Sequence, residues 1–119
     1  DLIRFDMTID YGGSHSVERV KVFIYDLALL LNEHTSSNHP SFLVHDNIFD
    51  VDQDTLIESL NFLYTLKNPE SFQYILTLNN DKLDNKESKD RLLFDIHNYS
   101  RAILTKSDRF IRGNKYSEI

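Results

Sequence analysis

Two short apolar segments, separated by an amphipathic one, constrain the fold of this chain most strongly. Phe42-Leu43-Val44 is a continuous apolar run, and the segment from Phe72 to Leu78 is a second run of this type. Such runs are typical of parallel strands that are covered on both faces. Between them, apolar side chains follow a helical spacing at Leu56, Ile57, Leu60, Leu63 and Tyr64. This order predicts a βαβ unit within an α/β fold that has a mainly parallel sheet and flanking helices.

A longer helix and a strand are expected before this unit. Apolar residues recur at three- and four-residue spacing over 17–33, which predicts a helix with one buried face. From Ile3 to Ile9 apolar and polar residues alternate, which predicts a strand with one exposed face. The intervening Tyr11-Gly12-Gly13-Ser14-His15-Ser16 supplies two glycines for a turn and two serines that can cap the helix.

After the first apolar run, the helix of the βαβ unit is expected to begin directly after Asp52, its N-cap, and to end at Asn68-Pro69. A polar stretch follows the second run. Further predicted elements are a short surface helix carrying Leu92, Leu93 and Ile96, a third strand at 101–106 and an edge segment at Phe110-Ile111.

Composition narrows the classes of protein to which this chain can belong. Its 119 residues suit one domain, and no segment approaches the roughly 20 apolar residues that a membrane span needs. The absence of cysteine excludes thiolate chemistry and favours the cytoplasm. A net charge of −6, with dispersed Lys and Arg, argues against strong nucleic-acid binding by this chain alone. Asp1 opens the chain without a methionine, so we expect the chain to be either a piece of a longer protein or a processed one.

Candidate site residues lie where the two predicted parallel strands end. Asp46 follows the first strand, and Asn79 follows the second. Ligands of open α/β sheets gather at the carboxyl ends of the strands. A carboxylate directly after a buried strand is well placed to hold Mg²⁺, usually through water. The alternative is an aspartate that only caps the strand or the turn.

The order of these features resembles the second half of an ABC-type ATPase head, and therefore a partial P-loop NTPase lobe. The resemblance treats 1–119 as one C-terminal lobe, with a signature-like region at 10–33, a Walker B and D-loop-like region at 41–53 and a switch-strand-like region at 72–80. More narrowly, His45-Asp46-Asn47 and Thr77-Leu78-Asn79-Asn80-Asp81 resemble an uncharacterised bacterial family found at the C-terminus of SMC- and RecN-like coiled-coil ATPases.

The resemblance implies a role for each matching residue. Asp46 matches the Walker B aspartate that holds Mg²⁺, and Asp52 matches the D-loop aspartate that acts across a dimer interface. The signature-like region would present serine hydroxyls and backbone N–H groups to the γ-phosphate of ATP on an opposite head, through Gly12, Gly13, Ser14 and Ser16. Either serine fits as the contact, and an ordinary capped turn is the alternative.

Two positions depart from the pattern of the ABC-type family. Asn47 stands where a glutamate normally polarises the attacking water, and an amide cannot accept that proton. Asp50 is near enough in sequence to substitute, or is a surface acid. Asn79 or Leu78 stands where a histidine is expected, and Asn79 can still hydrogen-bond a phosphate or water. These departures favour Mg-ATP binding over fast hydrolysis.

The resulting expectation is an incomplete ATPase head. It would dock onto an N-terminal lobe of the same protein that carries the Walker A loop, dimerise with ATP, and serve DNA repair, genome maintenance or defence against phage and plasmids. DNA would be reached through the complete assembly, and no membrane contact is expected. One alternative is a non-hydrolysing interaction module, and another is a metal-dependent nuclease lobe that uses Asp50 and Asp52. The five histidines show no spacing typical of a metal site.

Overall fold

The computed structural model describes residues 3–4, 6–8, 15–66, 71–105 and 107–108. In chain order, its α-helices and strands are α1 His15–Leu31, β1 Phe42–His45, α2 Gln53–Thr65, β2 Gln73–Leu76 and α3 Lys86–Arg91. Short 3₁₀ helices lie at Ser36–Asn38, Asn80–Lys82 and Ile96–Tyr99.

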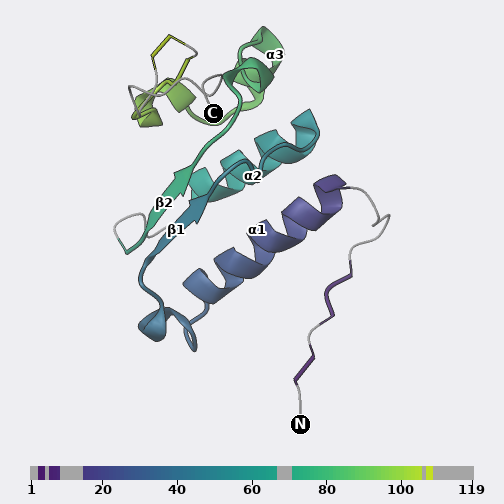
Figure 1. Ribbon diagram of the computed structural model, residues 1–119, viewed down its shortest axis with the longest axis vertical. Coiled ribbons are helices and arrows are strands. Elements are labelled where there is room, and N and C mark those ends of the chain that lie inside the picture. Colours follow the sequence, from purple (N-terminus) through teal and green to yellow (C-terminus); the bar gives the residue numbers. More distant parts are fainter. Residues whose placement is uncertain (1–2, 5, 9–14, 67–70, 106, 109–119) are drawn as a thin grey trace, which may run out of the picture.

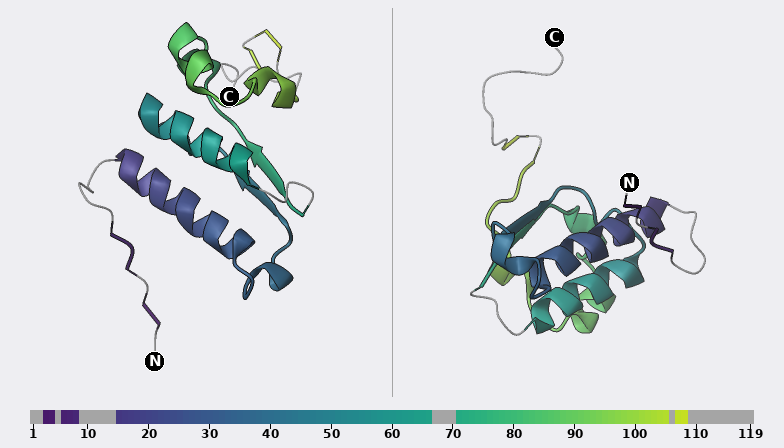
Figure 2. Two further views of the ribbon diagram at one scale, coloured as in Figure 1. Left: turned by 180° about the vertical axis from the view of Figure 1, so that it is seen from behind. Right: turned by 90° about the horizontal axis from the view of Figure 1, so that it is seen from below.

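The two strands form a parallel pair in which Phe42 lies opposite Gln73 and His45 lies opposite Leu76. Because α2 connects them, the predicted βαβ unit and the α/β class are confirmed. The arrowheads of β1 and β2 point to the end of the molecule at which α1 and α2 begin (Figure 1). The reversed view shows the same arrangement (Figure 2). The carboxyl ends of both strands and the first turns of both helices therefore share one edge of the molecule.

The core lies on one face of this sheet. It joins α1, the loop after β1 and α2 through buried apolar side chains: Phe23, Leu27, Leu30, Ile48, Phe49, Val51, Leu56, Ile57, Leu60, Leu83 and Leu92. Alternate strand residues pack against this cluster or are buried beside it, namely Leu43, His45, Tyr74 and Leu76. Because successive strand side chains point to opposite faces, the sheet presents one face to the helices.

The other face of the sheet is exposed, so the expectation that both faces are covered is wrong for the described residues. Phe42, Val44 and Ile75 are 49%, 56% and 44% exposed. The physical reason is that the buried cluster formed by α1 and α2 packs only against the alternate side chains of the strands. Three apolar side chains on paired strands form a patch of the kind that another protein surface commonly covers.

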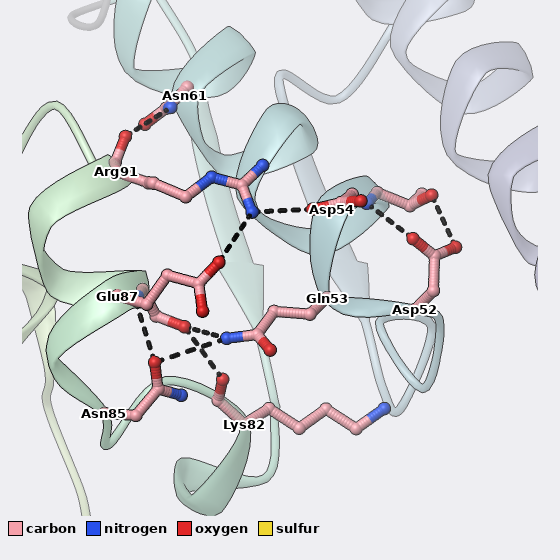
Figure 3. A network of polar contacts seen from close by, with 10 residues as sticks. Asp52, Gln53, Asp54, Asn61, Lys82, Asn85, Glu87 and Arg91 are labelled. Carbon is pink, nitrogen blue, oxygen red and sulfur yellow. Dashed lines mark hydrogen bonds and ion pairs between the residues drawn. The ribbon is translucent and has the colours of Figure 1, made fainter.

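Helix α3 is joined to α2 by a polar network (Figure 3). Arg91 Nη1 donates to Asp54 Oδ1 at 2.6 Å, and the Asn61 amide donates to the Arg91 carbonyl oxygen at 3.1 Å. The Gln53 amide hydrogen-bonds the Ser88 hydroxyl, and Ser88 is fully buried. Because α3 contains no apolar residue, these polar contacts hold the segment after β2 against α2.

Several predicted elements differ from the structure. The first helix spans His15–Leu31 rather than 17–33, and the described residues among 3–9 and 101–106 form no strand. A strand needs a neighbour for its backbone groups, and within the described residues β1 and β2 pair only with each other. The helix predicted around Leu92 and Ile96 is also wrong: α3 ends before Leu92, and Ile96 begins a 3₁₀ helix. Phe110-Ile111 lies outside the described residues, as does Asn68-Pro69.

Among the helices that the structure describes, none combines the length and the hydrophobicity that crossing a bilayer requires.

Candidate functional site

Asp46 lies directly after β1, and its carboxylate is exposed at the carboxyl edge of the sheet. Thr77, which follows β2, donates its hydroxyl to Asp46 Oδ1 at 2.5 Å. The oxygen of the same hydroxyl accepts the backbone N–H of Asn47 at 3.0 Å. Thr77 therefore fixes both the carboxylate and the turn behind it. Sequence reasoning missed this role, although Thr77 stands in the quoted Thr77-Leu78-Asn79 motif.

A small cavity of about 190 Å³ opens between the loop after β1 and the segment after β2. Asn47, in the loop after β1, and Asn79, three residues after the end of β2, both line it, together with Phe49, Asp50, Leu78 and Lys82. The structure thus brings together Asn47, Asp50 and Asn79, the three residues that the sequence placed in catalytic positions. The parallel pairing of β1 and β2 is the reason, since it carries both strand ends to one edge.

Asp50 is held by two cations from different parts of the chain. Lys82 Nζ lies 2.9 Å from Asp50 Oδ1, and Arg19 Nη1 on α1 donates to the Asp50 carbonyl oxygen at 3.0 Å. Hydrogen bonding to Lys82, then the charge of Lys82 and that of Arg19, lower the pKa of Asp50 below its usual range. A carboxylate whose pKa is lowered accepts a proton less readily, which weakens Asp50 as a substitute general base.

Lys82 also holds the backbone of the loop between Asp46 and α2. Its ammonium lies 3.0 Å from the Val51 carbonyl oxygen and 3.5 Å from that of Phe49. Lys82 follows the second strand, more than 30 residues away in sequence. Its role could not be recognised from local spacing, because a lysine in a polar stretch has no distinguishing pattern.

Asp52 is the N-cap of α2, which confirms the predicted capping role. Its carboxylate accepts the Thr55 backbone N–H at 2.9 Å and the Thr55 hydroxyl at 2.6 Å. These hydrogen bonds lower the pKa of Asp52, because they favour its ionised form. The D-loop role of Asp52 stays a prediction.

The depressed pKa of Asp52 predicts a stability difference that depends on pH. The stabilising contribution of the ionised carboxylate is present above the unfolded-state pKa of about 3.9 and is lost as pH falls through the lower folded-state value. Asp52→Asn retains a capping oxygen but does not titrate. We expect wild type to be the more stable at pH 6 and the gap to shrink as pH falls below about 3.9 and through the lower folded-state pKa. Urea unfolding of both proteins across this pH range measures the difference in unfolding free energy. A difference that widened in acid would contradict the lowered pKa of Asp52.

Loss of the cap itself has a separate effect. Asp52→Ala removes both hydrogen bonds to Thr55 and is expected to lower the free energy of unfolding by about 1 kcal/mol at neutral pH. The same urea experiment measures this loss, and Asp52→Asn is the matched control. Equal destabilisation by both substitutions would show that capping is not the cause.

Of the remaining predicted site residues, the structure describes Asn79 and Ser16. Asn79 accepts the Asp81 backbone N–H at 3.1 Å and so caps the 3₁₀ helix that carries Lys82. Ser16 lies in the first turn of α1, whereas Gly12, Gly13 and Ser14 lie outside the described residues. The signature-like contact with a phosphate therefore stays a prediction.

No cluster of three or more His, Asp or Glu side chains suited to a metal ion is found within the described part of the chain. Mg²⁺ does not need such a cluster, because it is commonly held by one or two carboxylates, water and substrate phosphates. The exposed carboxylate of Asp46 is of the type that can hold Mg²⁺ together with water and a phosphate, and its metal role stays a prediction. His45 lies beside Asp46 but is buried against Asp26 and Tyr74, a contact that no sequence pattern indicated.

Comparison with known proteins identifies a family for this chain. Residues 2–113 match the family described as "Uncharacterised protein conserved in bacteria (DUF2326)". Because the match covers nearly all of the 119 residues, the chain belongs to this family. No curated protein and no solved structure matches the chain significantly. The expected membership of an uncharacterised bacterial family is confirmed, and the link of that family to SMC- and RecN-like ATPases stays a prediction.

Proposed function

We propose that this member of the DUF2326 family is the C-terminal lobe of an SMC- or RecN-like ABC-type ATPase head. In this proposal it binds Mg-ATP together with an N-terminal lobe of the same protein that carries the phosphate-binding loop. Two such heads dimerise around ATP, and the assembly acts on DNA in repair, genome maintenance or defence against phage and plasmids.

The observation that carries the proposal is the position of Asp46. It stands exposed at the end of one of two parallel strands, and Thr77 from the end of the other strand holds its carboxylate. Mg²⁺ held there would neutralise charge on the phosphate oxygens of ATP. The first turns of α1 and α2 lie at the same edge (Figure 1), where helix N-termini favour negatively charged ligands.

The exposed face of the sheet supports an incomplete lobe. Phe42, Val44 and Ile75 are apolar, lie on paired strands and are each about half exposed. Contact with the N-terminal lobe would remove this patch from water and stabilise the joined head. In this proposal, the N-terminal lobe both completes the nucleotide site beside Asp46 and covers the exposed face of the sheet.

The side chains around Asp46 favour nucleotide binding over rapid turnover. Asn47 cannot accept a proton, and the pKa of Asp50 is lowered by Lys82. This observation also favours the second candidate, a non-hydrolysing module in which nucleotide serves only to assemble the complex. The nuclease alternative is weaker, because Asp50 is paired with Lys82 and Asp52 with Thr55.

Metal removal tests the proposal on the complete protein, with its upstream lobe. We expect a fluorescent ATP analogue to bind with Mg²⁺ present and to lose most of its affinity when EDTA is added, because Asp46 acts through the ion. Phosphate release separates the two candidates: slow release, below about 1 per second, indicates an ATPase, and none indicates the non-hydrolysing module. Failure to bind nucleotide at all would contradict both.

A further inference from the structure

His45 lies in the core at the end of β1 and is held by side chains from two other elements. Its Nε2 atom lies 2.7 Å from Asp26 Oδ2 on α1, and its Nδ1 atom lies 2.5 Å from the Tyr74 hydroxyl on β2. His45 is only 6% exposed. Three elements of the fold therefore meet at one imidazole ring, one residue before Asp46.

The partners determine what this ring can do. In the tautomer that satisfies both contacts, Nε2–H donates to the Asp26 carboxylate and the Tyr74 hydroxyl donates to Nδ1. Burial, and then the charge of Asp26, raise the pKa of Tyr74, which keeps its hydroxyl protonated. Both ring nitrogens are thus occupied and shielded from solvent. His45 is available neither as a general base nor as a metal ligand.

Ring packing restricts the imidazole further. The rings of His45 and Tyr74 meet nearly at right angles, with centroids 5.3 Å apart. Phe23 from α1 packs against both, at centroid distances of 6.3 Å. An imidazole with two hydrogen bonds and two aromatic neighbours has little freedom to rotate, so the strand end that carries it is fixed as well.

We propose that Asp26, His45 and Tyr74 form a positioning clamp for Asp46, an inference that rests on the proposed Mg-ATP function. His45 and Asp46 are consecutive, so the clamp fixes the backbone from which the Asp46 carboxylate projects. From the opposite side, Thr77 holds that carboxylate, and the Thr77 N–H donates to the His45 carbonyl oxygen at 3.1 Å. The clamp thereby ties the metal-binding aspartate to α1, the helix of the signature-like region.

Tyr74→Phe tests the clamp with the loss of a single hydroxyl. In the complete protein, the Mg²⁺ concentration that gives half-maximal ATP binding is expected to rise about tenfold, within the range for residues that support a metal ligand. ATP binding at saturating Mg²⁺ should stay within about twofold, because Tyr74 does not line the cavity beside Asp46. Tyr99→Phe is the matched control, since Tyr99 is 58% exposed and lies outside the clamp.

Variants of Asp26 test the same clamp from α1. Asp26→Ala leaves the His45 Nε2–H without its acceptor and is expected to act in the same direction as Tyr74→Phe. Asp26→Asn keeps an acceptor oxygen and is expected to restore part of the Mg²⁺ affinity. Thermal unfolding of each variant runs alongside, because a purely structural role would lower the melting temperature without moving the Mg²⁺ dependence.

The results of these experiments distinguish failure of the clamp from failure of the proposed Mg-ATP function. A raised Mg²⁺ requirement in Tyr74→Phe and Asp26→Ala, with Tyr99→Phe unchanged, supports the clamp. An unchanged requirement in both clamp variants, while Asp46→Ala loses Mg-dependent binding, overturns the clamp and leaves the proposed function standing. Wild-type Mg²⁺ dependence in Asp46→Ala itself overturns both.

Discussion

Replacing Asp46 by alanine is expected to lower the affinity of the complete protein for Mg-ATP by about a hundredfold or more. Loss of a residue that only supports a metal ligand typically costs 10- to 100-fold, and Asp46 is proposed to hold the ion itself. Asp50 in the same loop is paired with Lys82, so it cannot readily take the place of Asp46. Titration with a fluorescent ATP analogue at fixed Mg²⁺ measures the loss.

Two further variants complete this titration, one as a control and one with an intermediate effect expected. Asp90→Ala removes an exposed aspartate of α3 and is expected to leave the affinity unchanged. Thr77→Val removes the hydroxyl that holds Asp46 Oδ1 and should fall between wild type and Asp46→Ala. Equal Mg-ATP affinity of wild type and Asp46→Ala would reject Asp46 as the magnesium ligand, and with it the observation that carries the proposed function.

Replacing Leu56 by alanine is expected to lower the free energy of unfolding by about 3 kcal/mol. Leu56 lies in the first half of α2, is 0% exposed and belongs to the core that joins α1, α2 and the loop after β1. The substitution removes buried apolar atoms and leaves a cavity that the surrounding helices cannot close fully. Because a domain of this size is typically stable by about 5–15 kcal/mol, such a loss would be a large fraction of the total.

Urea unfolding of the two proteins measures this difference. Leu93→Ala makes the same chemical change at a residue that is 58% exposed, and it is expected to cost less than about 0.5 kcal/mol. A similar loss in both variants would contradict the placement of the core on the helix-covered face of the sheet. Because neither leucine lies in the cavity beside Asp46, this result is independent of the proposed function.

The amino-acid pattern alone predicted the βαβ unit and the end of its first strand, whereas β2 ends at Leu76 rather than at the predicted Leu78. Apolar runs at 42–44 and 72–78, with a helical pattern between them, have few other ways to bury their side chains. The N-cap at Asp52 was equally predictable, because capping depends on residues three positions apart. Once the strands were known to be parallel, Asp46 and Asn79 had to lie at one edge of the sheet.

The surroundings of Asp46 depend on how distant segments pack and could not be predicted from local patterns. Thr77 and Lys82 reach the loop after β1 from more than 30 residues away, and Asp26 on helix α1 reaches His45 on strand β1. Such contacts depend on how elements pack, and a single threonine or lysine has no periodic signal. The same limit explains why the described residues among 3–9 and 101–106 form no predicted strand: a pattern indicates which face of a strand would be buried, but a strand forms only where a neighbour accepts its backbone hydrogen bonds.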